Sequence, residues 1–156
     1  MTSDVRIRAA RLAEIDELGA LCLRSKAHWG YDAAFMARCV SSLRVTAGAI
    51  ADDLAFVAAM GERPVGVHQL ALKGAQAELD LLFVDPPAIG RGVGRRLYRH
   101  AEQLAMTRGC RELSIVADPF ARTFYVAMGA RYVEDGPSEG IPGRMLPRYV
   151  RDLGPS

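Results

Sequence analysis

Hydrophobic residues recur along the chain in two patterns, one with the period of a strand and one with the period of a helix. Strands are predicted where apolar residues alternate or run together, at residues 5–8, 54–60, 65–72, 77–84, 113–117 and 130–134. Helices are predicted where apolar side chains recur every three or four residues, at residues 13–26, 31–43, 91–108 and 119–128. A last strand is predicted at residues 145–152, where Pro147 weakens it or places it at a sheet edge.

The order of these elements predicts an α/β fold of the α+β kind, built on one mixed sheet. Short turns, such as the one at residues 61–64, join the early strands, which we therefore expect to pair antiparallel. The strands on either side of the helix at 91–108 are joined by a crossover, and we expect them to be parallel. The prediction is a largely antiparallel sheet of six or seven strands with helices on both faces, in a single domain over residues 1–156.

Composition excludes several classes of protein. Half of the 156 residues are hydrophobic and 24% are charged, which is typical of a globular domain with a core. No apolar run approaches the ~18 residues of a membrane span, and scattered charges in the N-terminal MTSDVRIRAARLAEID argue against a signal peptide. The three cysteines lie far apart without CxxC spacing, which favours the cytoplasm over a disulfide framework. Three histidines without an HExxH motif predict no metal site.

Positive charge is concentrated in one segment. The whole chain has 20 Lys and Arg against 18 Asp and Glu, a net charge of +2 that argues against a dedicated nucleic-acid protein. Between Gly90 and Arg111, however, the chain contains six arginines and only one acidic residue, Glu102, so this segment alone carries a net charge of +5. We therefore expect an anion to bind there.

Three glycines precede the long helix in the same segment. A predicted strand runs into a loop that holds Gly90, Gly92 and Gly94, and the loop opens the helix. Glycines lack Cβ atoms and let backbone N–H groups approach a ligand, while the first N–H groups of a helix lack intrahelical partners and carry the positive end of its dipole. With Arg91 and Arg95 beside it, this loop is predicted to bind a phosphate or pyrophosphate.

Two common phosphate motifs fit this loop poorly. The chain has no GxxxxGK[ST] sequence, which excludes a P-loop NTPase. In a dinucleotide fingerprint that starts at Gly90 and Gly92, the third glycine would fall on Arg95, and too little chain follows for a second mononucleotide-binding half. An oxidoreductase with a bound dinucleotide is therefore a third-ranked hypothesis.

The segment LFVDPPAIGRGVGRRL resembles the acetyl-CoA motif of the GCN5-related N-acetyltransferase (GNAT) family. The family pattern Q/R-x-x-G-x-G/A follows a strand and falls here on residues 89–94, with Ile89 in place of Gln or Arg. The element order also fits the family from about Val5 to the end of the chain. The resemblance therefore covers nearly the whole sequence and implies the mixed sheet described above.

A second family motif follows at the expected distance. ADPFARTFYVAMGARY resembles N-x-x-A-x-x-F-Y-x-x-x-G-F, with matches at Ala121, Phe124, Tyr125 and Gly129. The chain departs from the pattern where Asp118 replaces Asn and Ala130 replaces Phe.

The resemblance implies transfer of the acetyl group of acetyl-CoA to a primary amine of a small molecule or peptide, by direct attack in a ternary complex. Tyr125 matches the family tyrosine that protonates the leaving thiolate, and Glu78 matches a position where some members hold a catalytic base acting through water. Asp80, two residues further along the strand, is the alternative base. If the base and the acid do not act, the alternative is a non-catalytic acyl-CoA-binding sensor module.

The resemblance also implies the binding residues. Backbone N–H groups at the end of the strand at 77–84 are expected to hold the acetyl oxygen, since this strand end splays from the strand at 113–117. The implied cofactor-binding residues are Leu82, Phe83, Val84, Ile89, Gly90, Arg91, Gly92, Val93, Gly94, Arg95 and Asp118. The amine acceptor is expected near His28, Trp29 and Tyr31. The loop at residues 136–144 is either a surface turn or a cover over the acceptor, and the sequence favours the turn. No nucleic-acid or membrane partner is expected, and a homodimer is left open.

Overall fold

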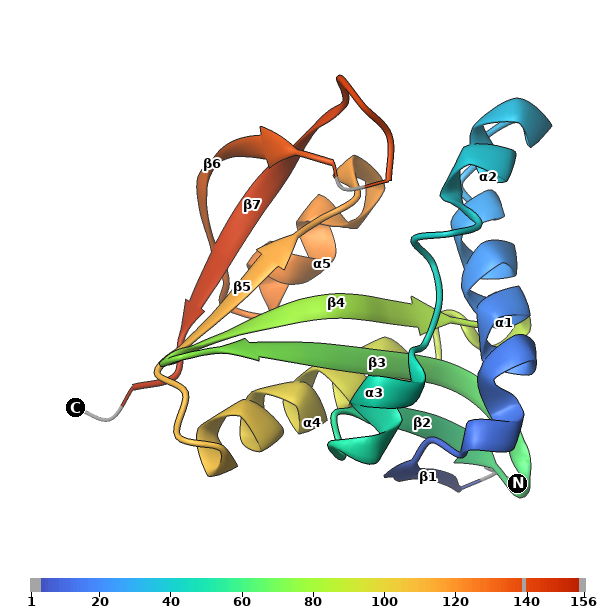
Figure 1. Ribbon diagram of the computed structural model, residues 1–156, viewed down its shortest axis with the longest axis horizontal. Helices are drawn as coiled ribbons and strands as arrows, with labels where there is room; N and C mark the ends of the chain where they lie inside the picture. The colour runs from blue at the N-terminus through green and yellow to red at the C-terminus, as the bar shows by residue number, and fades with distance from the viewer. Residues whose placement is uncertain (1–3, 139, 155–156) are drawn as a thin grey trace.

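One seven-stranded mixed sheet forms the centre of the protein (Figure 1). The structure, a computed structural model, describes residues 4–138 and 140–154. Along the sheet the strands lie in the order β1-β2-β3-β4-β5-β7-β6. The strands are β1 (Val5–Ala9), β2 (Ala55–Met60), β3 (Arg63–Lys73), β4 (Gln76–Val84), β5 (Glu112–Val116), β6 (Arg131–Pro137) and β7 (Met145–Asp152). The helices are α1 (Ile15–Ala27), α2 (Ala33–Cys39), α3 (Ala47–Ala51), α4 (Val93–Thr107) and α5 (Arg122–Ala127), with 3₁₀ turns η1 (Leu12–Glu14), η2 (Pro86–Ala88) and η3 (Pro119–Ala121).

Tight turns fix the direction of the central strands. Gly61 and Gly74 adopt left-handed backbone, with φ of 62° and 61°, and close the turns that join β2 to β3 and β3 to β4. Both strand pairs are antiparallel, whereas β4 and β5 are parallel and are connected through α4. These pairings confirm the predicted mixed, largely antiparallel sheet.

Helices cover both faces of the sheet, as the sequence predicts. On one face, α1 buries Leu18 and Leu21 in a cluster with Val67 of β3. The neighbouring residue Gly66 points to the opposite face, where α4 packs so closely that a Cβ on Gly66 would lie 2.7 Å from Leu97. The core therefore has two layers, one on each side of the sheet.

A β-bulge at Asp80 changes which face β4 presents to each helix. At this point β4 contains one residue more than β3, and Asp80 is the residue without a partner. Leu79 packs in the α4 cluster, whereas Leu81 packs in the α1 cluster and Phe83 lies against it. Simple alternation of side chains along a strand predicts Leu79, Leu81 and Phe83 on one buried face. That expectation is wrong because an extra residue reverses the alternation.

One predicted helix is markedly shorter in the structure, and one short helix was not predicted. The helix predicted at 31–43 starts only after Asp32, whose carboxylate accepts a hydrogen bond from the Phe35 N–H, and it ends at Cys39. The short helix α3 was not predicted. It begins after Thr46, whose hydroxyl accepts from the Ala49 N–H at 3.1 Å. Five residues are too few to show helical periodicity in a sequence.

Pro147 lies inside the sheet and not at its edge. Strand β7 pairs with β5 on one side and with β6 on the other. The carbonyl of Pro147 accepts a hydrogen bond from the Ala117 N–H, one residue beyond the end of β5. A residue's N–H and C=O point to the same side of a strand, so the missing N–H of Pro147 faces a place where the ladder already ends.

None of the helices in the described part of the chain is long and apolar enough to cross a membrane. Within the same residues, His, Cys, Asp and Glu side chains form no group of three or more placed to hold a metal ion.

Candidate active site

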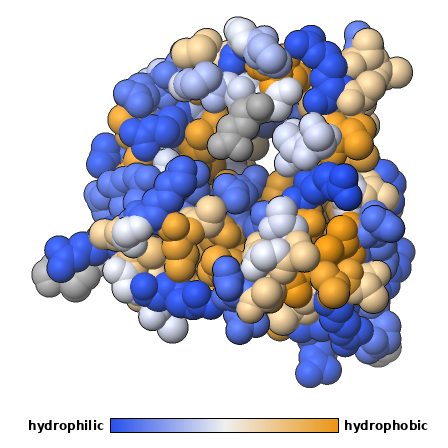
Figure 2. Space-filling model, in the orientation of Figure 1, coloured by the Kyte–Doolittle hydropathy of each residue, from blue (hydrophilic) through white to orange (hydrophobic). Residues whose placement is uncertain are grey.

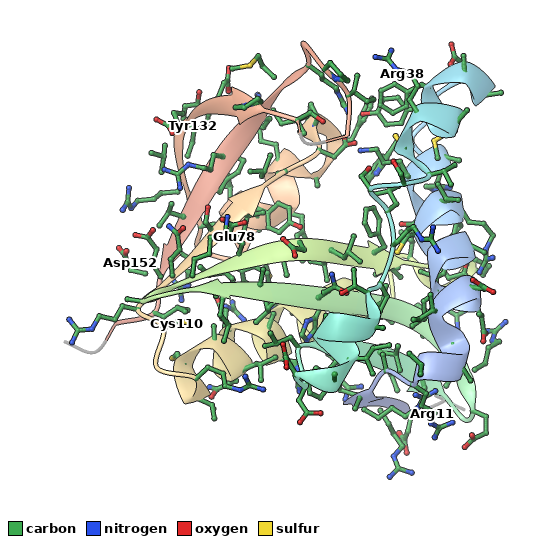
Figure 3. The ribbon with its side chains drawn as sticks, viewed as in Figure 1. Arg11, Arg38, Glu78, Cys110, Tyr132 and Asp152 are labelled. Carbon is green, nitrogen blue, oxygen red and sulfur yellow. The ribbon has the colours of Figure 1, made fainter. Side chains whose placement is uncertain are left out.

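The sheet opens into a V between β4 and β5. The two strands pair only at Gln76–Glu112, Ala77–Leu113 and Glu78–Ser114, and beyond these pairs both continue apart. The sequence expectation of a splayed strand end is therefore confirmed. Figure 3 labels Glu78 near the point where the ribbons of β4 and β5 separate. Backbone groups of Leu79–Val84 on the β5 side consequently lie outside that ladder.

A cavity of about 760 Å³ fills this V and extends to the start of α4. In the space-filling view, the molecule is hollowed between the part that carries β5–β7 and the part that carries α1 and α2 (Figure 2). The cavity brings together most of the residues expected from the sequence: Trp29, Glu78, Asp80, Leu82, Phe83, Val84, Ile89, Gly90, Gly92, Val93, Gly94, Arg95, Asp118 and Tyr125. Three expected residues, His28, Tyr31 and Arg91, lie outside its lining.

The glycine loop leaves open space in front of the first turn of α4. Gly90 and Gly92 adopt φ of 86° and 79°, a backbone conformation that residues other than glycine rarely adopt. A Cβ at either position would have no neighbour within 4 Å, so nothing in the described structure occupies the space in front of the loop. The helix begins at Val93, two residues later than predicted, and its first N–H groups face this space together with Arg95. These groups can bind an anionic ligand.

Tyr125 projects from α5 into the aromatic part of the core and reaches the cavity. Its ring lies 5.1 Å from that of Phe124 and 6.3 Å from that of Tyr149, measured between centroids. Burial raises the pKa of the Tyr125 phenol well above its ordinary value, so the group keeps its proton at neutral pH. It can therefore donate a proton to a group that enters the cavity.

Glu78 is held in place by an ion pair. Its carboxylate lies 2.9 Å from Nζ of Lys73, and the side chain is partly buried at the narrow end of the V. Asp80, on the bulge, also lines the cavity and is more exposed. The structure thus brings both expected carboxylates to the same cavity.

Asp118 is bound by other side chains of the protein. It caps η3 by accepting from the Phe120 N–H at 2.9 Å, accepts from Lys26 at 2.5 Å and accepts from the Tyr31 hydroxyl at 2.9 Å. Burial alone would raise the pKa of Asp118, but these hydrogen bonds outweigh burial and lower it. Its expected contact with a cofactor therefore competes with protein partners that are already bound.

Trp29 forms one wall of the cavity with Phe120. The two rings stack with centroids 5.4 Å apart and planes 7° apart. Trp29 is 41% exposed and Phe120 is 55% exposed, although the helical spacing of Phe120 from Phe124 predicts a core position for it. His28 touches Trp29 edge-on outside the cavity. Tyr31 lies behind Phe120 and accepts a hydrogen bond from Arg144 at 2.9 Å.

Sequence reasoning missed several charged and polar residues of the cavity. Lys26, Ser114 and Arg148 line it, and Arg148 donates to the Ser114 hydroxyl at 3.2 Å. The alternation of Leu146 and Arg148 in the last strand, continued by Arg144 just before it, is the pattern that could have indicated one face of β7 in the cavity. Of the loop at 136–144, Ser138 and Arg144 line the cavity, while Glu139 lies outside the described residues.

Comparison with solved structures supports this fold over nearly the whole chain. PaiA N-acetyltransferase from Thermoplasma acidophilum, solved in complex with coenzyme A, matches with a TM-score of 0.79 at 16% identity, covering 96% of this chain and 99% of that one. A GCN5-related N-acetyltransferase from Rhodopseudomonas palustris matches with a TM-score of 0.77 at 22% identity, covering 97% and 98%. The YncA structure from Salmonella typhimurium, solved with its cofactor acetyl-CoA, matches with a TM-score of 0.72 at 15% identity, covering 99% and 96%.

A family model provides the assignment at the level of sequence. No curated protein matches the chain. The model of the acetyltransferase (GNAT) family matches residues 26–130, which is more than half of the chain and includes the V, the glycine loop and Tyr125. The protein therefore belongs to the GNAT acetyltransferase family.

Proposed function

We propose that this protein transfers the acetyl group of acetyl-CoA to a primary amine. The observation that carries the proposal is the single cavity in which the open strand end of β4, the glycine loop of α4, Glu78 and Tyr125 meet. The solved relatives that hold coenzyme A or acetyl-CoA support the choice of donor.

The glycine loop suits the pyrophosphate of the donor. The open space in front of Gly90 and Gly92 admits a phosphate to the N–H groups at the start of α4, where the helix dipole favours negative charge. Arg95 adds a full positive charge at the same place. The pantetheine chain would then run along Leu82–Val84, whose backbone lies beyond the β4–β5 ladder.

Acetyl-CoA would supply an activated thioester, and three groups of this chain would act on the reaction. The N–H groups at the end of β4 would stabilise charge that develops on the acyl oxygen, and such a donor is typically worth about 3 kcal/mol. Glu78 would take a proton from the acceptor ammonium, whose pKa is near ~10, so that the free amine can attack. Tyr125 would donate its proton to the departing sulfur.

The test combines binding with turnover. Calorimetry with acetyl-CoA is expected to show one site, and incubation with amines is expected to release free thiol that depends on enzyme and amine. Binding without thiol release for any amine would favour a non-catalytic sensor of acyl-CoA. Binding of a nicotinamide dinucleotide, with none of acetyl-CoA, would reject the proposal.

A further inference from the structure

Strands β4, β5 and β7 form the floor at the narrow end of the cavity. Glu78 of β4 pairs with Ser114 of β5, and Arg148 of β7 pairs with Val116, the next residue of β5 on the same face. Helix α1 packs over the β2–β4 part of this face, whereas Val116 is exposed and lines the cavity. An acceptor that reaches the narrow end of the cavity therefore rests on the side chains of β5 and β7.

Charge is divided across this floor. Strand β4 contributes two carboxylates, Glu78 and Asp80, and the far strand β7 contributes the guanidinium group of Arg148. Between them lies the buried hydroxyl of Ser114, which accepts from Arg148. The side of the floor that carries the two carboxylates also carries Glu78, the proposed base. An amine is thus favoured over β4 and an acidic group over β7.

Arg148 retains donors that face the cavity. Its side chain is 26% exposed, and one Nη donates to Ser114 at 3.2 Å. Its Nε lies 3.4 Å from a carboxylate oxygen of Glu134, but that side chain is 62% exposed, and an ion pair with so exposed a partner is weak. A guanidinium group has five N–H donors in a planar fork that matches a carboxylate. Arg148 can therefore bind a carboxylate without losing the Ser114 contact.

The other cations of the cavity lie at the glycine loop or are bound to protein groups, and Arg95 is the one at the glycine loop. Arg144 donates to Tyr31 and lies over the Phe35 ring, 4.8 Å from its centroid. Lys26 is bound to Asp118, and Lys73 is paired with Glu78. Arg148 is consequently the cation best placed to recognise an acidic group of the acceptor.

We propose that the acceptor is an amino acid or a close relative, whose amine lies over β4 while its carboxylate binds Arg148. This inference rests on the proposed acetyltransferase function and names its class of acceptor. The N–C bond would form between the acceptor nitrogen and the acetyl carbon as the C–S bond breaks. One proton of the ammonium would leave through Glu78 before the attack, and Tyr125 would give its proton to the departing thiolate. The second proton that the nitrogen loses as the amide forms would pass to the Tyr125 oxygen and restore its phenol.

The experiment compares amines that differ only in the acidic group. Thiol release from acetyl-CoA is measured with the standard amino acids, their primary amides and the matching aminoalkylphosphonates. We expect at least one amino acid to exceed its amide at least tenfold in kcat/KM, as loss of a charged hydrogen bond predicts. Equal rates for acid and amide, or faster turnover of a phosphonate, would overturn the carboxylate assignment.

Variants of two arginines test whether Arg148 is the residue that causes the preference for the acid over the amide. In Arg148→Gln we expect the preference for the acid to fall below twofold through a rise in KM, and in Arg148→Lys we expect part of it to return. Arg131→Gln is the matched control, since Arg131 lies on the edge strand β6 outside the cavity lining and pairs only loosely with Asp152 at 3.8 Å. It should retain the full preference.

Failure of this inference is distinguishable from failure of the proposed function. If acid-bearing amines are not acetylated while uncharged amines are, the acceptor class is wrong and the acetyltransferase proposal stands. If acetyl-CoA binds and no amine of either kind reacts, both are wrong. An unchanged preference in folded Arg148→Gln would assign the carboxylate to another residue. If that variant does not fold, the wild-type preference for acid over amide decides alone.

Discussion

The ammonium group of Lys26 lies 2.5 Å from the carboxylate of Asp118, and both side chains are almost fully buried at the cavity wall. The two residues are 92 positions apart and join the end of α1 to the start of η3. Lys26 also lies 5.2 Å from the centroid of the Tyr31 ring, so an aromatic face shields the pair from water. The contact holds together the two segments that carry Trp29 and Phe120.

Asp118→Asn is expected to destabilise the fold by about 3 kcal/mol, because it leaves the buried charge of Lys26 without its counterion. Asparagine still caps a helix, so the loss reports on charge and not on capping. Chemical denaturation measures the change. Adding Lys26→Met to Asp118→Asn should recover stability, and no recovery would mean that the ion pair is not the cause.

Gly92→Asp is expected to abolish measurable acetyl-CoA binding, since it places a side chain and a negative charge in the space before α4. Gly61→Asp is the matched control, because Gly61 has a similar positive φ and equally open space but lies in the turn between β2 and β3. Calorimetry should detect wild-type affinity in this control. Unchanged affinity in Gly92→Asp would place the donor elsewhere.

Glu78→Gln is expected to lower kcat by a factor of ~10² to 10⁴ and to leave acetyl-CoA affinity intact. The loss should shrink at high pH, where the free amine is already abundant. Asp80→Asn, which changes the neighbouring carboxylate of the same cavity, should have a much smaller effect. The reverse order of the two variants in steady-state kinetics would make Asp80 the base.

Tyr125→Phe is expected to lower kcat while the affinity for acetyl-CoA and the melting temperature stay near wild type. Because burial raises the pKa of Tyr125 above its ordinary value of 10, wild-type activity should decline only above pH 10, and the variant should lack that decline. Tyr132→Phe removes a hydroxyl from the exposed strand β6 and serves as the control. Full activity with an unaltered pH profile would remove Tyr125 from the mechanism.

The protein is expected to become less stable as the pH decreases, because it contains a buried histidine. His68 is 0% exposed, and its Nε2 lies 2.9 Å from Nδ1 of His100. Burial and the neighbouring His100 lower the pKa of His68 from 6.5 to about 3. Between these two pKa values the unfolded chain binds a proton at this histidine and the folded chain does not. The stability that comes from His68 is therefore fully present above pH 6.5 and is lost as the pH falls towards 3.

The slope of that loss is about 1.4 kcal/mol per pH unit for one histidine, once the pH is well below 6.5. His68→Leu should flatten the dependence between pH 6.5 and pH 5 in urea denaturation. At pH 7 two effects of His68→Leu oppose each other, since it removes the contact of Nε2 with His100 and also removes Nδ1, which has no hydrogen-bond partner in the described structure. An unchanged slope in the variant would assign the pH dependence to other groups.

Local signals predicted most of the fold. The turn at Gly61 and the helical stripe of α4 depend on neighbouring residues, and the structure confirms both. The bulge at Asp80 was not predictable in this way, because it arises from a mismatch in length between β4 and β3. No residue type in β4 marks that mismatch.

The site residues also fall into those that local sequence predicts and those that depend on contacts between distant segments. The glycine loop and Tyr125 lie in continuous motifs, and both were expected in the cavity where the structure places them. The partners of Asp118 were not expected, since Lys26 and Tyr31 reach it from about 90 residues away in the chain. The contact of Arg148 with Ser114 likewise depends on how β7 inserts between β5 and β6.

Because Trp29 stacks on Phe120 at the cavity wall, the intrinsic tryptophan fluorescence of the protein reports on the cavity. The sequence contains a single tryptophan, so all indole emission originates at one wall of the cavity. A ligand that enters between α1 and η3 changes the polarity around that ring, and rapid-mixing fluorescence can follow its arrival and departure without a label. Donor and acceptor can therefore be added in either order and their rates of entry compared, which would reveal whether one must bind before the other.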